Sequence, residues 1–320
     1  MKHNHPFLYR LSLILHRFVS TSPGLTKAYL AAWSLLLRSG CSFPLKRNLA
    51  INLYGYDWQS VRFGPKSVNV TDNCAINLIP NVGEFDFNAL FSKDLDYESE
   101  LFALLSKRIS KYDAVIEIGA NVGVYTSFFS VLLGSLGLST PVFAFEPSKR
   151  AFLRLQDNLA ANRAKNVYAF NLAIADESRF MRFFEPDGHL TNGSLAVDFA
   201  AKFSDHVVET IVPSFAADQL IELVSGHTRL LVKIDVEGAE EVVLKSLTSL
   251  ILDKRPEIIL EVLKSYQERL NQISALRDNY DFYLVTPNGL EQRKTLEAHP
   301  RYRDYLLIPH GEIGDHRLVP

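Results

Sequence analysis

The stretch that decides the fold is Ala114-Val115-Ile116-Glu117-Ile118-Gly119-Ala120-Asn121-Val122-Gly123. Its apolar start predicts a buried strand, and the apolar residues from Tyr125 to Leu133 predict a helix after it. Glycine between the two allows a tight bend and lets a ligand come close to backbone N–H groups. This order of strand, glycine-rich loop and helix is typical of a loop that binds a nucleotide-like cofactor.

Strands and helices alternate along much of the remaining chain. Further apolar runs predict strands at residues 142–145, 167–174, 230–234 and 256–262, and helical patterns follow several of them. Strands that are apolar throughout are buried on both faces. The pattern therefore predicts an α/β fold with a doubly wound, mostly parallel sheet of Rossmann-like type. Ligands of such sheets bind at the carboxyl ends of the strands.

The N-terminal third of the chain has a different pattern. Two amphipathic helices are predicted at about residues 7–19 and 25–38, and neither apolar stretch is long enough to cross a bilayer. We expect a helical extension over residues 1–44, a small β-rich entry segment over 45–95 and the main domain over 96–320. The helices are interpreted either as a cap on the main domain or as a face that meets a membrane surface or a partner.

Composition and charge limit the class of partner. Hydrophobic residues make up 47% of the 320 residues, and the formal net charge is −2. A nucleic-acid-binding surface normally has a basic excess, so we expect no nucleic acid partner and a small or neutral substrate. Two cysteines, Cys41 and Cys74, are too few for a disulfide framework, which favours a reducing compartment, the cytoplasm. The histidines lack ligand spacing, so no metal site built from histidines is predicted.

The choice of cofactor depends on two acidic residues. Glu146 closes the strand after the loop, where a carboxylate can accept hydrogen bonds from both ribose hydroxyls. A dinucleotide site requires the order Gly-x-Gly-x-x-Gly, but Asn121 stands at the middle glycine and the last glycine is missing. Glu117 would repel a pyrophosphate and suits the ammonium group of a methionine moiety. The loop therefore favours S-adenosylmethionine over a nicotinamide cofactor.

Several stretches resemble the FkbM-type methyltransferases. They are residues 115–123, Phe145-Glu146-Pro147-Ser148, residues 233–240 (Lys-Ile-Asp-Val-Glu-Gly-Ala-Glu) and residues 255–262, with Tyr97-Glu98 ahead of the first strand. The resemblance covers about residues 95–265. It implies a class I methyltransferase fold and methyl transfer, usually to a hydroxyl oxygen of a sugar, glycan or secondary metabolite. Ser214-Phe215-Ala216 stands where the family commonly has Thr-Leu-Asp, so an aspartate near the acceptor is absent.

The resemblance also implies which residues bind the cofactor. They are Glu117, Gly119, Asn121 and Gly123 around the methionine half, Thr126 in the following helix, Glu146 at the ribose, and Asn171 and Ala173 beside the adenine.

The catalytic candidates are Asp235, Glu237, Glu261 and His189. Asp235 ends the fourth strand, where a carboxylate can take the acceptor's proton, orient its hydroxyl or hold a divalent cation such as Mg²⁺. Lys233 lies on the same side of its strand as Asp235 and is expected to pair with a nearby carboxylate. His189 belongs to the segment 178–217, interpreted as a lid over the acceptor, where a free imidazole would suit a general base.

Two alternatives remain open at this point. One is a nicotinamide-dependent oxidoreductase, which the missing glycine disfavours. The other is a non-catalytic binding module that keeps the fold, because a fold alone does not determine a function.

Overall fold

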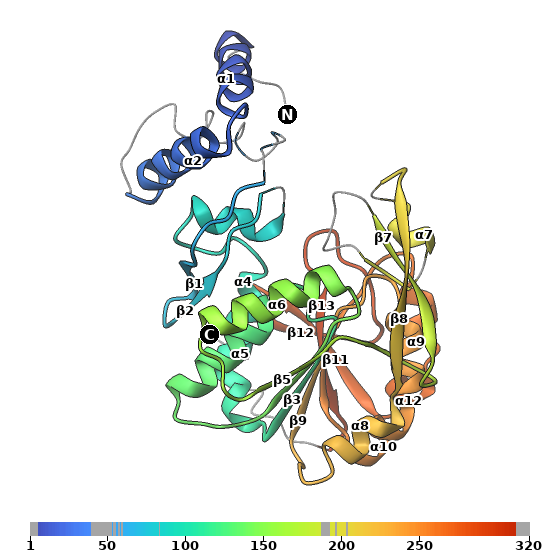
Figure 1. Ribbon diagram of the computed structural model, residues 1–320. Helices are drawn as coiled ribbons and strands as arrows, with labels where there is room; N and C mark the ends of the chain where they lie inside the picture. The colour runs from blue at the N-terminus through green and yellow to red at the C-terminus, as the bar shows by residue number, and fades with distance from the viewer. Residues whose placement is uncertain are drawn as a thin grey trace. The chain divides into compact units, whose positions relative to one another are not determined.

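The structure of the chain is a computed structural model, which describes residues 6–39, 53, 56, 58, 60–82, 84–186, 193–195, 197–202 and 204–311. The chain divides into two compact units, Met1–Asp96 and Tyr97–Pro320. Each unit has a hydrophobic core of its own, and Figure 1 shows the elements of both.

The N-terminal unit begins with the two predicted helices, α1 (Pro6–Val19) and α2 (Pro23–Arg38). A hairpin of β1 (Lys66–Thr71) and β2 (Cys74–Leu78) follows, and then a 3₁₀ helix, η1 (Phe85–Leu90). Arg38 joins these parts, because its guanidinium donates hydrogen bonds to the carbonyl oxygens of Ser67, Ala89 and Ser92. None of the helices that the structure describes is long and apolar enough to span a bilayer.

The larger unit is built on an eight-stranded sheet in the order β12-β11-β13-β10-β9-β3-β4-β5. The parallel strands are β3 (Ala114–Ile118), β4 (Val142–Phe145), β5 (Val167–Phe170), β9 (Leu230–Ile234) and β10 (Glu257–Glu261). β13 (Asp304–Pro309) runs antiparallel to both β10 and β11 (Tyr280–Thr286), and β12 (Gly289–Arg293) pairs with β11 at the edge. This is the predicted mostly parallel, Rossmann-like sheet.

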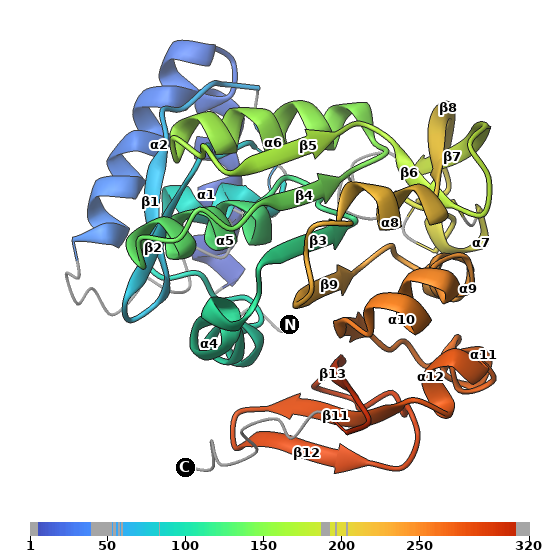
Figure 2. The same cartoon turned by 90° about the horizontal axis from the view of Figure 1, so that it is seen from below.

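Helices cover both faces of the sheet, as expected for a doubly wound fold (Figures 1 and 2). One face carries α4 (Ser99–Arg108), which continues into the 3₁₀ helix η2 (Ile109–Lys111), together with α5 (Val124–Ser135) and α6 (Lys149–Ala161). The other face carries α8 (Asp218–Leu223), α9 (Glu240–Ser246), α10 (Thr248–Lys254) and α12 (Ser274–Arg277), and α11 (Gln267–Asn271) lies close to α9 and α12.

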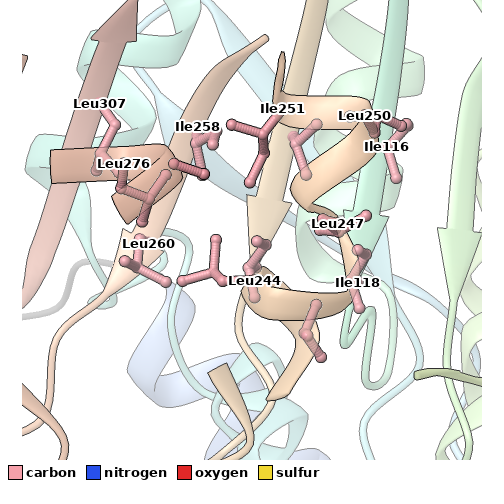
Figure 3. Packing of buried hydrophobic residues seen from close by; sticks show 14 of the residues in the cluster. Ile116, Ile118, Leu244, Leu247, Leu250, Ile251, Ile258, Leu260, Leu276 and Leu307 are labelled. Carbon is pink, nitrogen blue, oxygen red and sulfur yellow. The ribbon is translucent and has the colours of Figure 1, made fainter. Parts of the chain in front are cut away.

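The main core lies between the sheet and this second helix layer. Ile116 and Ile118 of β3 pack with Leu247 and Leu250, as Figure 3 shows. Alternate residues of a strand point to opposite faces. Glu117 therefore points away from this apolar core, toward the face that α4 and α5 cover.

The predicted strand over residues 167–174 is wrong in its second half. β5 ends at Phe170, and β6 (Ala173–Ala175) belongs to a separate three-stranded sheet with β8 (Val207–Ala216) and β7 (Phe180–Pro186). Asn171 lies at the break, and its side-chain amide donates hydrogen bonds to the carbonyl oxygens of Glu146 and Pro147. These two hydrogen bonds hold residue 171 against the end of β4, and β5 does not continue past Phe170.

The segment 178–217, interpreted from sequence as a lid, holds β7, the short helix α7 (Val197–Ala200) and β8, whereas residues 187–192, 196 and 203 lie outside the described residues.

Candidate active site

The glycine-rich loop joins β3 to α5 with an unusual backbone. Gly119, Asn121 and Gly123 have φ values of 88°, 51° and 81°. A Cβ on Gly119 would lie 1.7 Å from the carbonyl oxygen of Asp235, and one on Gly123 would lie 2.2 Å from Leu155 Cδ1. Both glycines are therefore required by a left-handed φ and by a close neighbour. The backbone N–H of Asp235 also donates to the Ile118 carbonyl at 3.0 Å, so the loop and the end of β9 adjoin.

Glu146 ties this loop to the end of β4. Its Oε2 accepts a hydrogen bond from the Asn121 N–H at 2.7 Å, and its Oε1 accepts one from the Ser148 N–H at 2.8 Å. The side chain is buried. Burial raises the pKa of Glu146 to about 7, although the two N–H donors favour the charged form. A carboxylate has further lone pairs, which can accept hydrogen bonds from a ligand.

A buried charge network lies on the α5 side of β3 and β9. Glu117 and Lys233 are direct neighbours on the two strands, and Thr126 Oγ1 donates to Glu117 Oε2 at 2.7 Å. Lys233 Nζ donates to Asp235 Oδ2 at 2.9 Å and lies 4.3 Å from the centre of the Tyr125 ring. The sequence predicted that Lys233 pairs with a nearby carboxylate, and the structure identifies this carboxylate as Asp235. Burial raises the pKa of Glu117 to about 7, while the nearby Lys233 charge opposes the shift.

Further acids extend the network along the carboxyl edge of the sheet. Glu261 of β10 and Asp304 of β13 face each other as cross-strand partners. Burial and the charge of Asp235 raise the pKa of Glu261 to about 8, and burial and the charge of Glu98 raise that of Asp304 well above its ordinary range. Glu98, which precedes α4, accepts a hydrogen bond from Tyr125 Oη at 2.5 Å. Burial raises its pKa as well.

These acids border a pocket of about 500 Å³, within the range of small-molecule sites. It is lined by Glu98, Glu100, Leu101, Glu261, Val285, Pro300, Arg301, Tyr302, Arg303 and Asp304. Arg303 Nη1 lies 3.5 Å from Glu261 Oε1. The pocket is therefore at the carboxyl ends of β10 and β11, beside the charge network.

Three of the four predicted catalytic residues come together at this edge. Burial, followed by the charges of Asp235 and Glu261, raises the pKa of Glu237 to about 9. Glu237 has a φ of 52°, and its carbonyl oxygen accepts a hydrogen bond from Ser194 Oγ at 2.7 Å. His189 lies outside the described residues. Among the residues that the structure describes, no group of three or more His, Cys, Asp or Glu could hold a metal ion.

Of the two residues expected beside the adenine, Asn171 uses its amide within the chain, as described above, and Ala173 is buried at the start of β6. Sequence reasoning gave no role to Glu98 and missed Tyr125 and Asp304. Tyr125 had a usable signal, since it lies in the first turn of the helix after the loop. Asp304 had none, because its strand follows a region without a recognisable motif.

A doubly wound sheet, a left-handed glycine loop after its central strand and acids at the ends of the next strands define the class I methyltransferase fold. A profile of the methyltransferase FkbM domain matches residues 117–307, well over half of the chain. The chain therefore belongs to the FkbM methyltransferase family.

Individual relatives are more distant. Hexuronic acid methyltransferase AglP from Haloferax volcanii is 28% identical over 162 residues, which are 49% of this chain and 59% of AglP. Methyltransferase FkbM from Methylobacillus flagellatus KT has a TM-score of 0.40 at 17% identity, over 61% of this chain and 44% of that chain. Precorrin-6y C5,15-methyltransferase from Geobacter metallireducens GS-15 has a TM-score of 0.36 at 13% identity, over 68% of this chain and 91% of the other.

Proposed function

We propose that this chain transfers a methyl group from S-adenosylmethionine to a hydroxyl oxygen of a sugar, a glycan or a related small molecule. The observation that carries the proposal is the position of Asp235. Its backbone touches the glycine-rich loop, and its side chain is paired with Lys233 at the edge that also holds the pocket. The proposal puts the cofactor on the loop and the acceptor in the pocket, with the Asp235 carboxylate between them.

The residues around the loop fit the chemistry of S-adenosylmethionine. Glu117 is a buried acid that would gain from the ammonium group of the methionine half, because an opposite charge favours a carboxylate. Glu146 offers its remaining lone pairs to the ribose hydroxyls. When bound, the cofactor supplies a methyl carbon attached to a positively charged sulfur. Glu117 does not suit a pyrophosphate, which disfavours the nicotinamide-dependent alternative, whereas Glu146 could accept hydrogen bonds from the ribose of either cofactor.

The pocket fits an acceptor with several hydroxyl groups. Glu98, Glu261 and Asp304 can accept hydrogen bonds from hydroxyls, and Arg301 and Arg303 can bind a carboxylate substituent. An acidic sugar matches both kinds of group only when its carboxylate lies on the two arginines and its hydroxyls on the acids, because a carboxylate beside the acids would be repelled. The name of AglP, a hexuronic acid methyltransferase, supports this choice of acceptor class.

Asp235 is the proposed general base. As the acceptor oxygen bonds to the methyl carbon, the carbon–sulfur bond breaks and its electron pair stays on sulfur. The hydroxyl proton moves to the Asp235 carboxylate and then to solvent. Lys233 positions that carboxylate through its hydrogen bond.

The metal-holding role of Asp235 gains no support from the described residues, since no ligand group of three surrounds it. The cytoplasm is the proposed location, and the free, buried thiol of Cys74 fits a reducing compartment.

The test is the turnover of Asp235→Asn with acidic and neutral sugars, measured as transfer of labelled methyl from S-adenosylmethionine. Loss of a general base should lower turnover by about 10²- to 10⁴-fold, while cofactor affinity in calorimetry stays close to the original. The variant should stay folded, because Glu98 and Glu117 still neighbour Lys233.

Asp113→Asn is the matched control. Its carboxylate accepts hydrogen bonds from the Thr228 and Arg229 N–H groups before β3 and β9, at the opposite edge of the sheet. It should keep full turnover. Equal turnover of the two variants would remove Asp235 from the reaction, and a wild-type chain without affinity for S-adenosylmethionine would refute the proposal as a whole. Tight cofactor binding without methyl transfer would support the non-catalytic alternative.

A further inference from the structure

Helix α1 presents its more apolar side outward within the N-terminal unit. Leu11, Ile14, Leu15 and Phe18 are all exposed, with exposed fractions of 65% for Ile14 and 66% for Phe18. At about 100° per residue they form one stripe about 100° wide along the helix. We call these four residues the α1 stripe. An exposed group of large apolar side chains is uncommon on a surface that meets only water.

The inward side of α1 is more polar and is fixed in place. Ser12, His16 and Val19 are buried, and the His16 ring contacts the rings of Tyr29 and Trp58 with centroids 5.6 and 4.6 Å apart. Burial lowers the pKa of His16 to about 4, so the ring is neutral near pH 7. Because these contacts fix the rotation of the helix, the α1 stripe stays exposed among the described residues of its own unit.

The charged residues in the N-terminal part of the sequence all have one sign. Residues 1–56 contain seven of the 34 Lys and Arg residues, and all 36 Asp and Glu residues come later in the chain. Arg10 and Arg17 are exposed and lie along one edge of the α1 stripe. An apolar stripe with a basic edge and no acid is the pattern of a helix that lies in the interface of an anionic membrane.

We propose that α1 binds this protein to an anionic lipid surface, with the α1 stripe in the headgroup–acyl boundary and Arg10 and Arg17 on lipid phosphates. An uncharged groove on a protein partner would bind the apolar side chains but leave the arginines without a counter-charge. A bilayer with anionic lipid binds both the apolar side chains and the arginines. Apolar insertion and electrostatic attraction act together, since one weak signal alone gives only marginal membrane binding. The proposal is independent of the methyl-transfer reaction.

The experiment is flotation of the full chain with two kinds of vesicle, phosphatidylcholine alone and phosphatidylcholine mixed with phosphatidylglycerol. Binding to the mixed vesicles should be stronger by about tenfold or more and should weaken as salt is raised. The Ile14→Gln/Phe18→Gln variant should lose binding to both. Arg10→Gln/Arg17→Gln should lose only the preference for anionic vesicles.

The matched control is Phe180→Gln/Ile211→Gln on β7 and β8, which changes the same residue types at exposed fractions of 78% and 62%. It should float like the wild type. Equal flotation of the Ile14→Gln/Phe18→Gln variant, or no flotation of the wild type, would overturn the proposal. If the wild type is a dimer and the Ile14→Gln/Phe18→Gln variant is a monomer, the α1 stripe is an interface between copies. A lowered melting temperature of the variant without a change in flotation would mean that another part of the chain covers it.

Discussion

Binding of S-adenosylmethionine should release protons from Glu117 and Glu146. Both side chains are almost fully buried, and burial raises the pKa of each to about 7. Each carboxyl therefore holds about half a proton at pH 7. The proposed cofactor brings an ammonium group to Glu117 and hydroxyl donors to Glu146, and both favour the charged form. We expect up to about one proton released per cofactor near pH 7, and almost none near pH 9.

The assay is titration calorimetry in two buffers with different heats of ionisation, since the difference in observed heat gives the number of protons. Glu117→Gln and Glu146→Gln should each remove about half a proton from that number. Glu240→Gln is the matched control, because Glu240 is equally buried with a pKa raised to about 7 by burial but accepts the Gly238 N–H after β9. Proton uptake, or binding without proton exchange near pH 7, would refute the assignment of these two acids.

Gly119→Ala should lower the free energy of unfolding by more than about 2 kcal/mol in denaturant titration, because of the positive φ and the Asp235 carbonyl 1.7 Å from the new Cβ. Gly134→Ala, in α5 with open space around it, should be neutral or stabilising, and an equal cost at both sites would contradict the loop geometry. The N-terminal unit should lose stability as pH falls from about 6.5 toward 4, because the unfolded chain binds the His16 proton more tightly than the folded one. Fluorescence of Trp33 and Trp58, the two tryptophans of the chain, follows this unit alone, and a His16→Phe variant with the same pH dependence would remove His16 as the cause.

The parallel strands and the loop could be predicted from sequence because their signals are local. A buried parallel strand needs a run of apolar residues, and β3, β4, β9 and β10 all show one. The N-cap of α6 also depends on near neighbours, since the Ser148 Oγ accepts a hydrogen bond from the Ala151 N–H at 3.2 Å. Lys233 could be paired with a carboxylate because side-chain direction alternates along a strand. These features depend on neighbours within a few residues.

Contacts between distant parts of the chain could not be predicted in this way. Arg108 of α4 and Glu257 of β10 form a buried ion pair, to which Tyr112 adds a hydrogen bond of 2.5 Å. More than 140 residues separate Glu257 from both partners. The pairing of Glu261 with Asp304 depends on β13 returning antiparallel between β10 and β11. No local pattern near residue 304 indicates which strand it joins, so the pocket residues at positions 300–304 could not be predicted.

The balance of charge at the carboxyl edge is a physical argument for a cationic cofactor. Lys233 is almost fully buried, and its charge acts on Glu98, Glu117 and Asp304, while its Nζ is bonded to Asp235. One buried cation cannot neutralise so many acids, and burial therefore raises the pKa values of Glu98, Glu117 and Asp304. A dinucleotide would add negative charge to this edge and increase the repulsion. A ligand with a sulfonium and an ammonium group would supply the positive charge that the edge lacks. The acids would then be ionised in the complex, because a nearby positive charge favours the carboxylate form.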